Sequence, residues 1–283
     1  MVSGKLPLEY GVPAQPRQLR LDTTTACNAQ CLSCHRTLSP RRGGMSEELL
    51  TQLLDDVGKW VIPLQEVVPV NYGEFFILSN WAQLLNTISI RLPHTSIVIP
   101  TNGSLLDSDN LVGLVRCKTL RVINWSINAY LPKTYEGFMG LDYSVVESIK
   151  QLSRLIRYHR GEIVQWFSMV FDPLWHSEAE RDMFVTYWRQ YGVPQVLCAS
   201  SCNRTPLKLT TTLPCRSIFS DVVVGYDGKL SSCCFDSAFT LDLGWYSGDL
   251  FKDWQNRQLT ALREAHNQGR RQFYNLCRRC SFA

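Results

Sequence analysis

The sequence of 283 residues has few charged residues and no long apolar segment. Charged residues make up only 19%, and the formal net charge is +4. Two dense basic spots, Arg41–Arg42 and Arg278–Arg279, are too short to form a nucleic-acid surface. No segment reaches the ~20 uninterrupted apolar residues that a membrane-spanning helix needs. These absences argue against nucleic-acid and membrane partners.

The N-terminal segment lacks the apolar stretch of a secretory signal peptide. Residues 1–16 (MVSGKLPLEYGVPAQP) contain Pro and Gly and predict an irregular lead-in. We therefore expect a cytoplasmic protein whose cysteines are reduced. Eleven cysteines in such a compartment indicate metal or redox chemistry more than disulfide bonds.

Residues 17–205 alternate between strand and helix patterns, and an apolar content of 45% is enough for a full core. Alternation of this kind favours parallel pairing with right-handed crossovers. We predict an α/β fold, a partial (β/α)6 TIM-like barrel, whose chemistry lies in the loops after the strands. Strands are expected at 17–25, 66–73, 96–103, 120–128, 162–171 and 194–200, with helices at 46–57, 80–92, 108–116, 142–159 and 177–191.

The pattern changes after about residue 205. Residues 221–235 predict two strands around an Asp-Gly turn, which is typical of a β-hairpin. Residues 250–269 predict one helix, and the chain then ends with two further cysteines. We expect a small α+β domain over residues 206–283.

Three cysteines follow the first expected strand: Cys27, Cys31 and Cys34, at spacings of x3 and x2. Three thiolates can hold a [4Fe–4S] cluster and leave one iron free to bind a substrate or cofactor. A zinc site needs a fourth ligand, and His35 is too close to Cys34 to reach the same metal without strain, so a distant residue would have to supply it. Buried cysteines with no shared role are the third interpretation.

This cysteine loop resembles the signature of the radical S-adenosylmethionine (radical SAM) family. Residues 71–78 (NYGEFFIL) resemble the family's Gly-Gly-Glu-Pro segment at the end of strand two, which binds the methionine amino group. Tyr72 replaces the first Gly and Phe75 replaces the Pro, whereas Gly73 and Glu74 are retained. The resemblance implies that Tyr72, Gly73 and Glu74 contact the cofactor.

Two further segments extend the resemblance. Residues 101–106 (TNGSLL) resemble the strand-three Thr-Asn-Gly segment, which implies a cofactor contact for Asn102. Residues 125–128 (WSIN) place Ser126 and Asn128 where strand four meets the cofactor's ribose and carboxylate. The backbone of His35 is a candidate contact for the adenine edge. The residue before the third cysteine, commonly aromatic in the family, is Ser33 here.

The C-terminal region resembles the SPASM auxiliary-cluster domain in its short twitch form. The resemblance implies a second [4Fe–4S] cluster on four thiolates, with Cys233 competing for the middle position; the expected ligands are Cys215, Cys234, Cys277 and Cys280. A zinc ribbon on the same four cysteines is the alternative.

The family resemblance implies that the first cluster reduces SAM and that a 5′-deoxyadenosyl radical then removes a hydrogen atom from the substrate. Flavodoxin or ferredoxin would supply the electron. The C-terminal pattern resembles aminocyclitol- and sugar-modifying members, such as 2-deoxy-scyllo-inosamine dehydrogenases and radical SAM epimerases. We therefore expect a small-molecule sugar or aminoglycoside substrate, attacked at a carbinol carbon in antibiotic biosynthesis.

Cys233 decides between two outcomes for the substrate radical. A thiol beside the auxiliary cluster can return hydrogen to the opposite face, so we expect an epimerase with Cys233 as the donor; Cys198 and Cys202 are weaker candidates. Dehydrogenation, with the auxiliary cluster as electron acceptor, is the main alternative. Modification of a ribosomal peptide and a non-enzymatic zinc-binding module remain open. Phe235 and Asp236 are the candidate substrate contacts.

Overall fold

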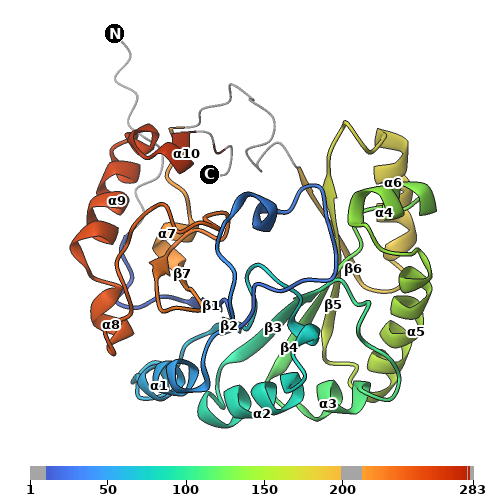
Figure 1. Cartoon of the computed structure of the whole chain (residues 1–283), viewed down its shortest axis with the longest axis horizontal. Helices are drawn as coiled ribbons and strands as arrows, with labels where there is room; N and C mark the ends of the chain where they lie inside the picture. Colours follow the sequence, from blue (N-terminus) through green and yellow to red (C-terminus); the bar gives the residue numbers. More distant parts are fainter. Residues whose placement is uncertain (1–10, 199–211, 279, 281–283) are drawn as a thin grey trace.

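The computed structural model describes residues 11–198, 212–278 and 280 (Figure 1). Residues 1–10 of the expected lead-in, Cys202 and the expected domain boundary at 205–206 lie outside the described residues, so that boundary stays a prediction. The side chain of Cys198 is also outside the description. Within the described residues, no helix is both long enough and apolar enough to cross a membrane.

Six parallel strands form the main part of one sheet, as predicted. Each strand pairs with the next along the chain, and the order of the whole eight-stranded sheet is β6-β5-β4-β3-β2-β1-β7-β8. The six are β1 (Gln18–Leu21), β2 (Glu66–Val68), β3 (Ser96–Thr101), β4 (Leu120–Ser126), β5 (Val164–Phe171) and β6 (Val193–Cys198).

Helices between these strands lie around the outside of the curved sheet (Figure 1). All five predicted helices are present, and α4 is an addition; the bounds are α1 (Glu47–Val57), α2 (Trp81–Arg91), α3 (Leu111–Arg116), α4 (Pro132–Met139), α5 (Ser144–His159) and α6 (Glu178–Trp188). The start of α1 follows from its N-cap, because the Ser46 hydroxyl accepts a hydrogen bond from Leu49 N at 3.2 Å.

The expected C-terminal hairpin is present, but it belongs to the barrel sheet. β7 (Asp221–Val224) pairs antiparallel with β8 (Leu230–Ser231), and it also pairs in parallel with β1 along its whole length. The C-terminal region therefore extends the edge of the barrel beside the strand that precedes the cysteine loop. Sequence periodicity predicts the hairpin, but it carries no information about which earlier strand of the chain the hairpin pairs with.

The prediction of a single helix over residues 250–269 is wrong. The structure divides it into α8 (Leu250–Asp253) and α9 (Arg257–Asn267). Asn256 starts the second helix, because its side chain accepts a hydrogen bond from Leu259 N at 2.8 Å. Three other short helices in the described C-terminal region were not expected: α7 (Ser217–Ser220), η4 (Arg271–Phe273) and α10 (Asn275–Arg278).

The alternation along β1 places a charged side chain inside the barrel. Leu19 and Leu21 are fully buried and belong to the hydrophobic core. Successive side chains of a strand point to opposite faces, so Arg20 points away from that core. Arg20 lines the pocket described below.

Candidate active site

A pocket lies where the loops after β1, β2, β3 and β4 meet the loop after β8. It encloses about 1070 Å³ of empty space, including its solvent-open part. Most of the residues predicted from the sequence line it: Cys27, Cys31, Cys34, His35, Tyr72, Gly73, Glu74, Asn102, Ser126, Asn128, Cys234 and Phe235. The structure therefore brings together the cysteine loop, three of the strand-end segments and one part of the C-terminal region.

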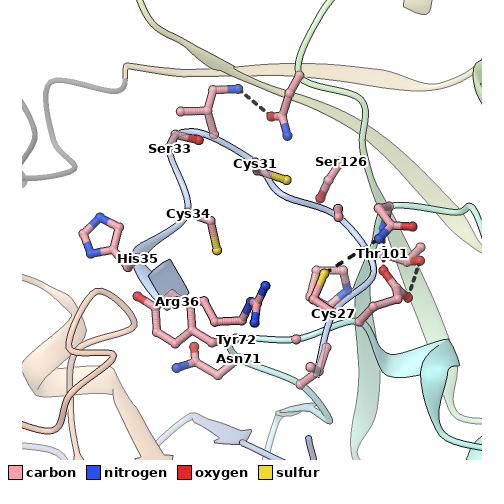
Figure 2. Close-up of a pocket in the computed structure, with 18 of the residues that line it drawn as sticks. Cys27, Cys31, Ser33, Cys34, His35, Arg36, Asn71, Tyr72, Thr101 and Ser126 are labelled. Carbon is pink, nitrogen blue, oxygen red and sulfur yellow. Dashed lines mark hydrogen bonds between the residues drawn. The ribbon is translucent and has the colours of Figure 1, made fainter. Parts of the chain in front are cut away.

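The thiols of Cys27, Cys31 and Cys34 point toward the same space (Figure 2). Burial raises the pKa of Cys27, and it raises the pKa of Cys31 to about 12, so both stay protonated unless a cation binds them. The described residues contain no group of three or more His, Cys, Asp or Glu side chains arranged to hold a single metal ion. Three cysteine thiolates are a ligand set that a [4Fe–4S] cluster can use, with one iron left free.

Gly73 allows the loop after β2 to pack directly on the cysteine loop. A Cβ atom at Gly73 would overlap the carbonyl oxygen of Thr24 and lie 2.9 Å from that of Ala26. The neighbouring Glu74 N donates a hydrogen bond to Ala26 O at 2.8 Å. The absence of a side chain at Gly73 therefore sets the distance between two walls of the pocket.

Glu74 is buried and already bonded to the next strand. Its Oε1 accepts hydrogen bonds from Thr101 Oγ1 at 2.8 Å and Phe76 N at 3.2 Å, and its Oε2 accepts one from Asn102 N at 2.8 Å. Burial raises the pKa of Glu74 despite these bonds. A carboxylate has about four acceptor positions, so one position on Oε2 can still receive an ammonium group in the pocket.

The side chains of Asn102 and Asn128 are largely occupied by the protein itself. Asn102 Nδ2 donates to Asn28 Oδ1 at 3.1 Å and lies 4.0 Å from Cys27 Sγ, so it ties the β3 loop to the cysteine loop. Asn128 has a positive φ of 61°, and its Oδ1 accepts a hydrogen bond from Val170 N at 2.9 Å. Both residues line the pocket, but their side chains hold its walls in place.

A second group of cysteines surrounds a smaller cavity. It consists of Cys215, Cys233, Cys277 and Cys280, with Phe235 and Arg271 also in the lining. The structure thus places Cys233, not Cys234, with the other three thiols, whereas Cys234 lines the first pocket. The lining of the two cavities favours Cys233 for the middle ligand position, where the sequence favoured Cys234, and the ligand set itself stays a prediction. Neighbouring side chains of a non-helical segment point in different directions, and spacing alone does not show which one faces inward.

Phe235 and Asp236 have different surroundings. Phe235 lines both cavities and therefore lies between the two groups of cysteines. Asp236 lines neither cavity, is 2% exposed, and accepts hydrogen bonds from Ser231, Thr240 and Leu241 within its own loop. The Asp236 carboxylate shapes the turn after the cysteine pair, which argues against the predicted contact between Asp236 and the substrate.

Hydrogen bonds join the loop of residues 234–237 to the barrel. Tyr72 Oη donates to Cys234 O, and His35 Nδ1 lies 3.1 Å from Phe235 O. Ser237 Oγ donates to His35 O at 3.0 Å, so the carbonyl of His35 is already bonded inside the protein. The predicted contact between the His35 backbone and an adenine stays a prediction.

Four polar residues of the site were missed at the sequence level. Arg20, Arg36 and Asn71 line the first pocket, and Asp22 lies just behind it, where its Oδ1 accepts a hydrogen bond from Tyr72 N at 3.4 Å. Burial raises the pKa of Asp22 to about 7. The signal for Arg20 was available in the alternation of Leu19, Arg20 and Leu21, since a charged residue on the inner face of a barrel strand indicates a functional position.

Comparison with known families identifies the C-terminal region. Residues 215–281 match SPASM, described as an iron–sulfur cluster-binding domain. The match begins at Cys215, the first of the four thiols around the smaller cavity, and spans the other three. A search of curated proteins finds no match to the sequence.

Solved structures with the same fold cover nearly the whole chain. One is BtrN in complex with AdoMet and 2-DOIA (TM-score 0.66, 16% identity, 93% of this chain and 92% of that one). Another is anSMEcpe with bound AdoMet (TM-score 0.68, 14% identity, 95% and 91%). A third is Streptococcus suis SuiB bound to S-adenosylmethionine (TM-score 0.65, 12% identity, 88% and 68%). The chain therefore has the fold of radical SAM enzymes with a SPASM region, as the sequence resemblance predicted.

Proposed function

We propose that this chain is a radical SAM enzyme with two [4Fe–4S] clusters. The observation that carries the proposal is the presence of two separate groups of cysteines, one of three and one of four, on either side of Phe235. The group of three lies in a pocket with room for a cofactor, whereas the group of four completes its own ligand set. The SPASM match and the AdoMet bound in similar structures support this assignment.

The bound cofactors would supply a 5′-deoxyadenosyl radical, which is reactive enough to remove hydrogen from an unactivated C–H bond. The chain's residues would hold the reactants and exclude water. Glu74 is placed to accept the methionine ammonium group with its remaining acceptor position. Ser126 and Asn128 line the far side of the same pocket, where the ribose and carboxylate would lie. A reducing compartment such as the cytoplasm suits this chemistry.

We propose that the reaction is epimerisation of a sugar carbinol carbon, with Cys234 instead of Cys233 as the hydrogen donor. Once the bound cofactors had removed a hydrogen atom from the substrate, the Cys234 thiol would give a hydrogen atom to the opposite face of the carbon. Cys234 would then regain its thiol by taking up one electron and one proton. Flavodoxin or ferredoxin would supply this electron and the one that cleaves SAM. The position of Cys234 in the first pocket supports the donor role.

Dehydrogenation is the second candidate, because BtrN, solved with 2-DOIA, is similar over 93% of the chain. In that reaction the substrate radical loses a proton to a base and an electron to the auxiliary cluster. Cys234 then has no role in turnover. SuiB has been solved bound to a precursor peptide, so the shared fold alone does not choose between a small molecule and a peptide.

Mass spectrometry of the product formed in deuterated water distinguishes these reactions. Epimerisation by an exchangeable thiol adds one deuterium and leaves the skeleton unchanged, so the product gains about one mass unit. A product about two mass units lighter would show dehydrogenation instead. The Cys234→Ala variant should still form 5′-deoxyadenosine but no epimer, and full activity in this variant would exclude Cys234 as the donor.

A further inference from the structure

The pocket region near Cys234 contains buried hydrogen-bond donors without matching acceptors. Arg20 Nε is buried and has no hydrogen-bond partner within the described residues. Asn71 Nδ2 is also buried without a bond of normal length, although it is near enough to Asp22 to lower the pKa of that carboxyl. Arg20 and Asn71 line the same pocket as Cys234. An unpaired buried donor is costly, so a site of this kind is completed by an acceptor on the ligand.

The acids around Arg20 do not neutralise it by direct contact. Burial raises the pKa of Asp221 on β7 and nearby Arg20 offsets only part of that rise, and the described residues show no ion pair within 4.0 Å for Arg20. Arg20 also lines a second pocket, with Asp221 and with Glu66 on β2, to which Gln18 Nε2 donates at 2.7 Å. Arg17 and Arg216 line this second pocket too, so its two acids are matched by two further bases.

The pocket that Arg20 shares with Cys234 also contains the guanidinium group of Arg36. Within the described residues, no carboxylate lies within 4.0 Å of the Arg36 guanidinium group. Among the described lining residues, Glu74 is the one carboxylate, and it is bonded to Thr101 and Asn102. A polycationic aminoglycoside would bring further positive charge to two guanidinium groups, which is unfavourable.

We propose that the substrate carries an anionic group, a carboxylate or a phosphate, which Arg20 binds beside Cys234. This inference rests on the proposed function, and it narrows the sugar substrate to an acidic one, such as a uronate or a sugar phosphate. A guanidinium group matches either anion through two parallel hydrogen bonds. Asn71 Nδ2 supplies a further donor on the same wall. Binding at this point fixes one end of the sugar while Cys234 faces its ring.

Equilibrium binding to the holoenzyme with SAM and no reductant tests the proposal. The probes are glucuronate, glucose 6-phosphate, glucose and glucosamine, measured by calorimetry under anaerobic conditions. At least one of the two anionic sugars should bind roughly ten- to a hundredfold more tightly than glucose, since a charge-assisted pair is stronger than a neutral one. The better of the two identifies the anion. Equal binding of all four, or tightest binding of glucosamine, would overturn the proposal.

Substitutions at Arg20 test the residue itself. Arg20→Gln should abolish the preference for the anionic sugar, Arg20→Lys should retain part of it, and Arg91→Gln, a control on the surface of α2, should leave it unchanged. If the Arg20→Gln variant still binds the anionic sugar more tightly than glucose, the proposal is wrong. It is also wrong if this variant loses affinity for SAM but keeps that preference. Formation of 5′-deoxyadenosine from SAM and dithionite reports separately on the proposed function. If it occurs without any anion preference, only the present inference fails.

Discussion

Cys233 and Cys234 are neighbours in the sequence with different surroundings in the structure. Cys233 faces three other thiols, and the proximity of Cys234, Cys215 and Cys277 adds to the effect of burial in raising its pKa. Cys234 lines the pocket that contains Cys27, Cys31 and Cys34. The pair therefore gives a matched experiment, because each residue serves as the control for the other.

Iron analysis of the two alanine variants tests this assignment. Cys233→Ala should lose about four irons per chain and the absorbance of one cluster, since a ligand of the auxiliary cluster is missing. Cys234→Ala should keep the iron content of the wild-type protein. The opposite pattern, with iron lost only in Cys234→Ala, would restore the ligand set preferred from the sequence.

Tyr72 occupies a position where the resembling family has glycine, and its hydroxyl donates to the carbonyl of Cys234. We expect Tyr72→Phe to lower the free energy of unfolding by about 1 kcal/mol and to leave the Cys234 thiol less firmly positioned. More 5′-deoxyadenosine should then form for each product molecule, because hydrogen return becomes less efficient. Tyr158→Phe is the control, since Tyr158 is 84% exposed. Unchanged coupling in Tyr72→Phe would show that this bond does not position Cys234.

Asp22 gives the protein a pH-dependent stability. Burial raises the pKa of Asp22 from 3.8 to about 7, so the folded protein holds this proton more tightly than the unfolded chain does. The contribution of protonated Asp22 to the free energy of unfolding is fully present below about pH 4, falls as the pH rises toward 7, and is lost above pH 7. Asp22→Asn should therefore raise the thermal midpoint relative to wild type more at pH 8 than at pH 5.5. A difference in thermal midpoint that does not change with pH would contradict the account.

At the scale of elements, the loop after β2 packs on the cysteine loop only because residue 73 has no side chain. Gly73→Ala should destabilise the protein by about 1–3 kcal/mol, as in other overpacked sites, and should weaken SAM binding by shifting one wall of the pocket. Gly11→Ala is the matched control, since a Cβ there would meet nothing within 4 Å. Thermal unfolding and SAM titration measure both effects, and a Gly73→Ala variant identical to wild type would show that the two loops can separate freely.

The strands and helices of the barrel could be predicted from the sequence because their patterns are local. Alternation marks β1, and Ser46 with two following acids marks the start of α1. The break between α8 and α9 was missed, since the apolar spacing continues through Trp254–Asn256 and only the cap formed by Asn256 divides it. The pairing of β7 with β1 joins residues about 200 positions apart, and no local pattern encodes it.

The candidate site was predictable to the extent that its residues belong to motifs. The cysteine loop and the strand-end segments converge on one pocket because parallel strands end at the same rim. Arg20, Arg36 and Asn71 belong to no motif, and the different orientations of Cys233 and Cys234 depend on how the C-terminal loop packs on the barrel. The charged groups of the pocket could be identified only once these side chains were placed together.

At the scale of the whole molecule, one continuous sheet carries two groups of cysteines. Phe235 lines the cavities of both groups and lies between them. The loop of residues 234–237 is bonded to the barrel through Tyr72 and His35, so the two groups keep a fixed relation. This arrangement suits a reaction that begins at the first group and exchanges an electron with the second.

The central claim is tested most directly by iron and sulfide analysis of the chain purified without oxygen, together with SAM cleavage by dithionite. We predict about eight irons and eight sulfides per chain, a brown colour, and formation of 5′-deoxyadenosine. The triple variant with alanine at Cys27, Cys31 and Cys34 should keep about four irons and lose SAM cleavage. A colourless wild-type protein that contains zinc and no sulfide, and that leaves SAM intact, would contradict the account.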